Sequence, residues 1–159
     1  MSLPPFDRVV TEHGPVVLRV CRALVGAIDA EDAWSETFLS ALRAYPDLRP
    51  DSDVRAWLVT IAHHRAIDLL RRRARTAVPT AELDDRAGPA GVDGLDEHLR
   101  AAVQSLPAKQ RAAVAYRYLA DLSYAQIGEL IDSSEAAARR SAADGIAALR
   151  TRDLQGVPR

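Results

Sequence analysis

Residues Leu122–Arg150 read LSYAQIGELIDSSEAAARRSAADGIAALR, which is a short helix, a tight turn and a longer helix in one stretch. Ser123 and Gln126 have the spacing of a capping box at the start of the first helix. The small side chain of Gly128 lets the two helices approach closely, and Asp132–Ser134 supplies polar turn residues. This pattern predicts a helix-turn-helix, whose second helix presents its first turns to DNA.

The side chains that would reach DNA lie at the start of the longer helix. Arg139 and Arg140 are long enough to meet phosphates or a guanine edge, and Ser134 can donate to a phosphate. The expected set is Ser134, Glu135, Ala137, Ala138, Arg139 and Arg140. Asp144 repels phosphate and Gly145 lowers helix stability, so the pattern is weaker farther along. An ordinary pair of core helices is the alternative interpretation.

A second basic helix precedes the helix-turn-helix by about fifty residues. Asp53–Arg75 reads DVRAWLVTIAHHRAIDLLRRRAR, an amphipathic helix that Ser52 could cap. Its far end places five positive charges within eleven residues: Arg65, Arg71, Arg72, Arg73 and Arg75. A solvated helix end stabilised by its dipole would also explain such a run. Together with the helix-turn-helix, it indicates a chain that holds DNA at two places.

The net charge of the whole chain is −1, which is unexpected for a protein that binds DNA unaided. Residues 1–73 hold ten basic and ten acidic side chains, and residues 95–159 hold nine and eight. Neither part can bind DNA tightly through general attraction to phosphate, so local arginine clusters must supply the contacts.

Helical spacing extends to the rest of the chain and predicts an all-α protein. Phe6–Ile28 is apolar at helical intervals, although Gly14-Pro15 should break or kink it. The next helix starts near Asp29 and has an apolar stripe that includes Phe38 and Leu42. Two small helical domains are expected, at 1–73 and 95–151, with a flexible linker at 74–94 and a tail at 152–159. The second domain is expected to be a helix-turn-helix module of four helices.

Several kinds of function are excluded by what the chain lacks. His63 and His64 are adjacent, so they point to different faces and do not form a metal pair. Cys21 lies among apolar residues, which indicates a structural thiol. No nucleophile–base arrangement or glycine-rich phosphate loop appears, so neither enzyme activity nor a metal or cofactor is expected. No apolar run approaches 18 residues and no signal peptide is evident, which predicts a cytoplasmic protein without membrane insertion.

Three segments together resemble one protein family. They are DAEDAWSETFLSAL, VRAWLVTIAHHRAIDLLRRR and SLPAKQRAAVAYRYLADLSYAQIGELIDSSEAAARR. In this order, across residues 6–150, they are similar to bacterial RNA polymerase sigma factors of the extracytoplasmic-function (ECF) group. The resemblance implies two helical domains that bind core RNA polymerase, recognise two promoter DNA elements and help to melt the upstream one. It also implies an anti-sigma protein as a regulatory partner.

The resemblance assigns roles to individual residues. The polymerase-docking helix is matched by Asp29, Asp32, Glu36, Thr37 and Phe38. The face that meets the melted upstream element is matched by Trp57, His63, His64, Arg65, Asp68, Arg71 and Arg72. The reader of the more distant element is matched by Ser134 to Arg140. Polymerase would then supply the affinity that a nearly neutral chain lacks.

Two other functions stay open at this point. A stand-alone helix-turn-helix regulator would bind an operator without polymerase, and would leave the acidic helix around Asp32 without a use. A sigma-like interaction module would keep the fold but lack promoter activity, as the weakly basic helix after Arg140 suggests.

Overall fold

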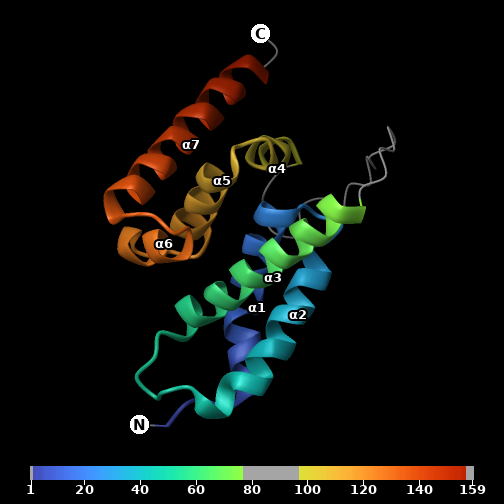
Figure 1. The fold of residues 1–159 in the computed structure, drawn as a ribbon, viewed down its shortest axis with the longest axis vertical. Helices are drawn as coiled ribbons and strands as arrows, with labels where there is room; N and C mark the ends of the chain where they lie inside the picture. Colours follow the sequence, from blue (N-terminus) through green and yellow to red (C-terminus); the bar gives the residue numbers. More distant parts are fainter. Residues whose placement is uncertain (1, 77–96, 157–159) are drawn as a thin grey trace.

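The structure is a computed structural model that describes residues 2–76 and 97–156, and every regular element in these ranges is helical. The expected all-α fold is therefore confirmed. The N-terminal module consists of α1 (Phe6–Val25), α2 (Ala30–Ala44), a 3-10 turn η1 (Tyr45–Asp47) and α3 (Val54–Thr76). The C-terminal module consists of α4 (Glu97–Gln104), α5 (Ala108–Val114), a π-helical turn η2 (Ala115–Leu119), α6 (Tyr124–Leu130) and α7 (Glu135–Gly156). Figure 1 shows α1, α2 and α3 side by side, with α4, α5 and α6 against them and α7 on the outer side of α5 and α6.

The expected domain boundaries fall only partly on these elements. The start of the predicted linker, residues 74–76, continues α3 as helix, and the remainder of it lies outside the described residues. The predicted tail likewise begins inside α7, which continues to Gly156.

A break or kink was predicted at Gly14-Pro15; helix α1 runs through Pro15 as one helix, so a break there is wrong. Proline removes one backbone hydrogen bond from a helix interior. Packing compensates for this loss, because Val17 and Val20 on the same helix are fully buried. The indole Nε1 of Trp34 on α2 also donates to the Gly14 carbonyl oxygen at 3.0 Å.

The first turns of α2 and α3 are capped differently from what the sequence predicts. Asp53, rather than Ser52, caps α3, because its carboxylate accepts a hydrogen bond from the Ala56 amide at 3.1 Å. Asp29 does stand at the N-cap of α2, but its side chain accepts no capping hydrogen bond.

The helix-turn-helix is confirmed in detail. Ser123 Oγ accepts from the Gln126 amide at 3.1 Å, and the Gln126 side chain accepts from the Ser123 amide at 2.9 Å, which completes the capping box. A Cβ atom at Gly128 would lie 2.7 Å from the Ser133 carbonyl oxygen, so glycine is needed where α6 meets the turn. A Cβ at Gly145 would lie 2.6 Å from Val114, so this glycine permits α5 and α7 to pack closely.

The two modules share one hydrophobic core. Side chains of the C-terminal module bind backbone carbonyls at the end of α1. Gln104 Nε2 donates to the Arg22 carbonyl at 3.0 Å and also to that of Ala23, and Arg111 donates to the Leu24 carbonyl at 3.2 Å. The modules therefore form one body in this state, rather than two bodies held only by a linker.

The π-helical turn η2 aims one tyrosine into this interface. Tyr116 is fully buried, whereas Tyr118 is exposed. The Tyr116 hydroxyl forms a short hydrogen bond with Nδ1 of His63 on α3. Burial raises the pKa of the neighbouring Cys21 to about 12, so this thiol stays protonated and serves packing.

Candidate nucleic-acid and polymerase interfaces

The outer face of α2 combines carboxylates with exposed leucines. Asp32 is exposed and Glu36 is half-buried one helical turn later. Leu39 and Leu42 continue the same face and are 55% and 51% exposed. The inward position predicted for Leu42 is therefore wrong. These four residues, here called the docking ridge, form an acidic and apolar surface suited to a partner that is both basic and apolar.

Two residues assigned to polymerase contact lie beneath this surface. Thr37 is fully buried, and its Oγ1 donates to the Ala33 carbonyl at 2.7 Å. Phe38 is buried against Trp34 and Phe6, with ring centroids 4.7 and 6.4 Å away. Their position in the core means that they orient α2 and cannot touch a partner directly.

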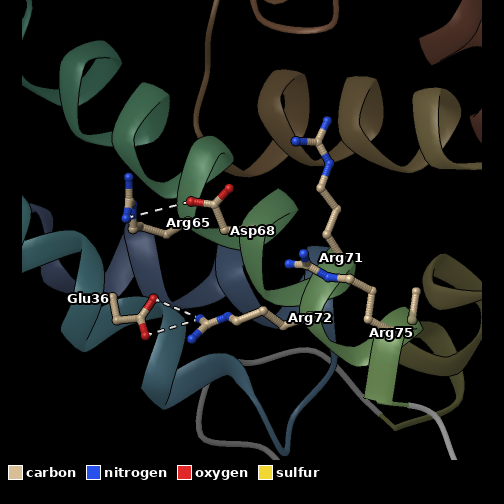
Figure 2. Close-up of a pocket in the computed structure, with 7 residues that line it drawn as sticks. Glu36, Arg65, Asp68, Arg71, Arg72 and Arg75 are labelled. Carbon is tan, nitrogen blue, oxygen red and sulfur yellow. Dashed lines mark hydrogen bonds and ion pairs between the residues drawn. The ribbon is translucent and has the colours of Figure 1, made fainter.

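The arginine block of α3 lines a groove against α2. The groove has a volume of about 770 Å³ and is lined by Glu36, Arg65, Asp68, Arg71, Arg72, Ala74 and Arg75. Figure 2 shows Arg72 reaching across to Glu36, at 3.3 Å, while Arg71 points away from this pair. Arg65 lies 3.6 Å from Asp68 on the same helix. The groove is therefore cationic with two internal carboxylates, a composition suited to a phosphate backbone.

The two adjacent histidines of α3 do point to different faces, as predicted. His64 is exposed, whereas His63 is buried against Tyr116. Burial, with a smaller contribution from His64, lowers the pKa of His63 to about 4, so the ring is neutral near pH 7. His63 thus joins the modules and is not accessible to DNA in this state.

The remaining part of the predicted melting face is covered by α6. Trp57 packs against Tyr45, with ring centroids 6.2 Å apart. Trp57 and His64 also line a cavity of about 300 Å³, whose opposite wall includes Leu122, Gln126 and Leu130. The C-terminal module therefore stands over the surface that the sequence assigns to unpaired DNA.

The predicted reader residues lie at the start of α7. Arg139 and Arg140 are exposed, and Arg139 lies 3.6 Å from Glu135. Ser134 Oγ accepts from the Ala137 amide at 3.0 Å and so caps the helix, which leaves its hydroxyl hydrogen available. Ala138 is fully buried, so it packs the helix and does not read DNA.

Sequence reasoning missed the aromatic support of Arg139. The Tyr124 ring, in the first turn of α6, lies 4.9 Å from the Arg139 guanidinium carbon and 4.6 Å from that of Arg117. Both distances lie within the range of cation–π attraction. The ring holds Arg139 in place without occupying its N–H groups. A tyrosine directly after the capping Ser123 was the available signal, but its partner lies fifteen residues away.

Comparison with known proteins agrees with this arrangement. The chain matches Sigma-70 region 2 over residues 9–76 and Sigma-70 region 4 over residues 96–149. It is 33% identical to RNA polymerase sigma factor CarQ of Myxococcus xanthus, over 91% of this chain and 87% of CarQ. It is 31% identical to the ECF sigma factor SigM of Mycobacterium tuberculosis, over 82% of this chain and 67% of SigM. The chain is an ECF sigma factor. It spans about half the length of another relative, SigE of Mycolicibacterium smegmatis, with 32% identity over 53% of that protein.

Solved sigma factors have the same fold. RpoE of Bartonella quintana, in complex with the anti-sigma factor NepR, superimposes with a TM-score of 0.76 at 20% identity, over 97% of this chain and 98% of RpoE. CnrH, in complex with the cytosolic domain of CnrY, gives 0.68 at 21% identity, over 96% of this chain and 89% of CnrH. Within residues 2–76 and 97–156, no helix of this sigma factor is long and apolar enough to cross a membrane.

Proposed function

We propose that this sigma factor directs core RNA polymerase to specific promoters and assists initiation of transcription. The observation that carries the proposal is that one chain holds an acidic–apolar docking ridge on α2 and two separate arginine surfaces, on α3 and α7. Its role is binding rather than catalysis, and its place of action is the cytoplasm. The near-neutral chain would obtain its DNA affinity from polymerase.

The docking ridge is the proposed polymerase contact. Asp32, Glu36 and Asp29 would face basic side chains, and Leu39 would supply the apolar centre that stable interfaces require. Thr37 and Phe38 support this helix from beneath.

The α3 surface is the proposed site for the melted upstream element. Arg65, Arg71 and Arg72 would bind the phosphates of a single strand, and Trp57 with His64 would offer a stacking surface for an unpaired base. Trp57 is half-buried and shares a cavity with residues of α6, so separation of the modules would expose it fully, whereas His64 and the arginine groove are already accessible. Separation would also release His63 from Tyr116.

The start of α7 is the proposed reader of the distal element. Arg139 and Arg140 would contact phosphates or base edges, and Ser134, Glu135 and Ala137 would border the major groove. Ala138 keeps this surface rigid from inside the module.

An anti-sigma protein is a further proposed partner. The solved structure of RpoE is a complex with the anti-sigma factor NepR, and that of CnrH is a complex with the cytosolic domain of CnrY. A protein that kept the modules of this sigma factor packed would keep Trp57 against α6 and His63 buried against Tyr116.

Reconstituted transcription tests the proposed function. Purified chain with core polymerase, supplied with genomic fragments, should yield promoter-specific transcripts that neither component yields alone. Replacing both Asp32 and Glu36 with lysine should abolish association with core, because like charges would then meet at the ridge. Exposed Asp144→Lys, on α7, is the matched control for charge reversal. Failure of core polymerase to capture the wild-type chain would end this proposal.

The same assay separates the two alternatives. A stand-alone regulator would bind genomic DNA without polymerase, which the net charge of −1 argues against. An interaction module without promoter activity would capture core polymerase but give no specific transcripts.

A further inference from the structure

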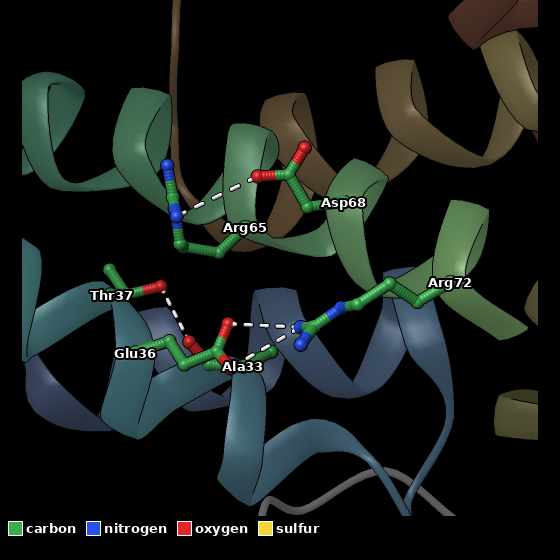
Figure 3. Close-up of polar contacts among 6 residues, drawn as sticks. All are labelled: Ala33, Glu36, Thr37, Arg65, Asp68 and Arg72. Atoms are coloured by element: carbon green, nitrogen blue, oxygen red, sulfur yellow. Dashed lines mark hydrogen bonds and ion pairs between the residues drawn. The ribbon is translucent and has the colours of Figure 1, made fainter.

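The carboxylates proposed to meet polymerase are paired with arginines of α3, one of which, Arg72, is proposed to meet DNA. Arg72 on α3 lies 3.3 and 3.4 Å from the two carboxylate oxygens of Glu36 on α2. Arg73 lies 2.7 Å from the carboxylate of Asp29, at the start of α2. Figure 3 shows Arg72 extended across the groove to Glu36. Carboxylates of α2 therefore neutralise positive charges of α3, and arginines of α3 neutralise negative charges of α2.

Asp29 forms the second of these pairs from the N-cap position of α2. An aspartate at an N-cap normally accepts a hydrogen bond from an amide in the first turn, which stabilises a helix by about 1 kcal/mol. The Asp29 side chain makes no such bond, although it is only 19% exposed. Its carboxylate instead lies against Arg73. The Asp29 backbone has φ −96° and ψ −5°, outside the extended region that capping residues normally adopt, and its carboxylate is left to pair with Arg73.

The two cross-helix pairs divide the arginine block. Arg72 and Arg73 are held by α2, and Arg65 is held within α3 by Asp68. Arg71 and Arg75 form no ion pair with another residue in the described ranges, and both line the groove. Two of the five cations are therefore neutralised by the helix proposed to dock on polymerase.

We infer that polymerase docking and DNA binding are coupled through these shared charges. The inference rests on the proposed function and adds its regulation. Basic side chains of polymerase compete with Arg72 and Arg73 for Glu36 and Asp29, and phosphates compete with the same carboxylates for the two guanidinium groups. Exposed ion pairs of this kind contribute about 0–1 kcal/mol, so exchange costs little. Because linkage is reciprocal, each partner strengthens binding of the other.

The chain alone provides the direct test. Binding of a fluorescein-labelled single-stranded oligonucleotide is followed by anisotropy at several salt concentrations, with Glu36→Gln, Asp29→Asn and the double variant. The double variant should bind roughly 3- to 10-fold more tightly than wild type at low salt. For the double variant, the slope of log binding constant against log salt concentration should become more negative by about 0.7 for each arginine that gains a phosphate.

Glu31→Gln is the matched control. Glu31 is exposed on the same helix, loses the same charge, and forms no ion pair with a described residue. Its affinity for the oligonucleotide should stay within about 2-fold of wild type, because an exposed charge at a distance is screened. If Glu31→Gln and Glu36→Gln raise affinity equally, general electrostatics accounts for the effect and the coupling is overturned.

Two further measurements isolate the Arg72–Glu36 pair. In an Arg72→Gln background, Glu36→Gln should no longer change oligonucleotide binding; an undiminished effect would show that the pair is not the route. Arg72→Gln should also tighten association with core polymerase in the absence of DNA, and unchanged or weaker association would contradict reciprocity. The oligonucleotide measurements need no polymerase, so they remain decisive even if reconstituted transcription fails.

Discussion

The arginines of α3 and of α7 are held in place by different means. Arg72 and Arg73 are bound by carboxylates, whereas Arg139 lies over the ring of Tyr124. A carboxylate occupies the same N–H groups that a phosphate needs, and added salt weakens the pair. An aromatic ring leaves those groups free. Arg72 and Arg73 must therefore exchange a carboxylate of another helix to bind DNA, whereas Arg139 has only a longer ion pair, 3.6 Å, with Glu135 of its own helix.

The largest effect is expected from a substitution at the contact between the two modules that carry these surfaces. Tyr116→Ala would leave a cavity between the modules, where the side chain is fully buried. We expect the free energy of unfolding to fall by about 3–5 kcal/mol, as for other large buried rings. Tyr116→Phe, which keeps the ring and loses the hydrogen bond to His63, should cost about 1 kcal/mol. Urea denaturation measures both, and a loss below about 1 kcal/mol for Tyr116→Ala would mean that the modules do not depend on each other.

The second largest effect is expected on acidification, which should weaken the contact between the modules. The pKa of His63 is about 4 in the folded chain, against the 6.5 of an ordinary solvated histidine in the unfolded chain. Between these values the unfolded chain binds a proton that the folded chain does not, so stability is lost as pH falls from about 6.5 towards 4. The full loss is about 3 kcal/mol. His63→Gln should flatten this part of the profile, while His64→Gln, at the exposed neighbour, should leave most of it.

A smaller effect is expected at the aromatic support of Arg139. Tyr124→Leu removes the ring beneath Arg139 and Arg117, and should weaken binding of duplex DNA by roughly 5-fold, corresponding to about 1 kcal/mol. Tyr124→Phe keeps the ring and should stay within about 2-fold. Anisotropy of a labelled duplex with the full chain at low salt measures both variants. Equal losses would assign the effect to the hydroxyl and not to the ring.

The smallest effect concerns the stability of the α2–α3 pairs. Glu36→Gln should change the free energy of unfolding by less than about 0.5 kcal/mol, because both partners are partly exposed. Thermal unfolding followed by circular dichroism provides the measurement. A loss of about 2 kcal/mol or more would identify the pair as a structural anchor, and the contrast with Arg139 would then disappear.

Local features of the chain were predictable from its sequence. Helical spacing located the long helices, and the capping box at Ser123 and the close approach at Gly128 were confirmed atom by atom. The opposite faces of His63 and His64 followed from helix geometry alone. Each of these depends on residues within a few positions of one another.

Long-range features were not predictable in the same way. His63 and Tyr116 lie 53 positions apart, and no periodicity relates them. Ser52 was predicted to cap α3, and the backbone at the start of the helix places Asp53 in that role instead. The helix phase that exposes Leu42 depends on how α2 rests on its aromatic neighbours in the core. The assignments of polymerase contacts and of contacts to the melted element came from family resemblance, and the burial of Thr37, Phe38 and His63 among them came from tertiary packing.

Arg111 of the C-terminal module binds the end of α1, and this contact matters for experiments on the isolated N-terminal module. Its guanidinium donates to the Leu24 carbonyl at 3.2 Å, and to the Gln104 and Leu106 carbonyls at 2.6 and 3.1 Å. A planar guanidinium group with five N–H donors can donate to three carbonyl oxygens at once, and the ammonium of a lysine cannot reproduce this geometry. A fragment cut after Thr76 would leave the last carbonyls of α1 to water. Its final turn would fray, so measurements on that fragment would describe a shorter first helix than the intact chain possesses.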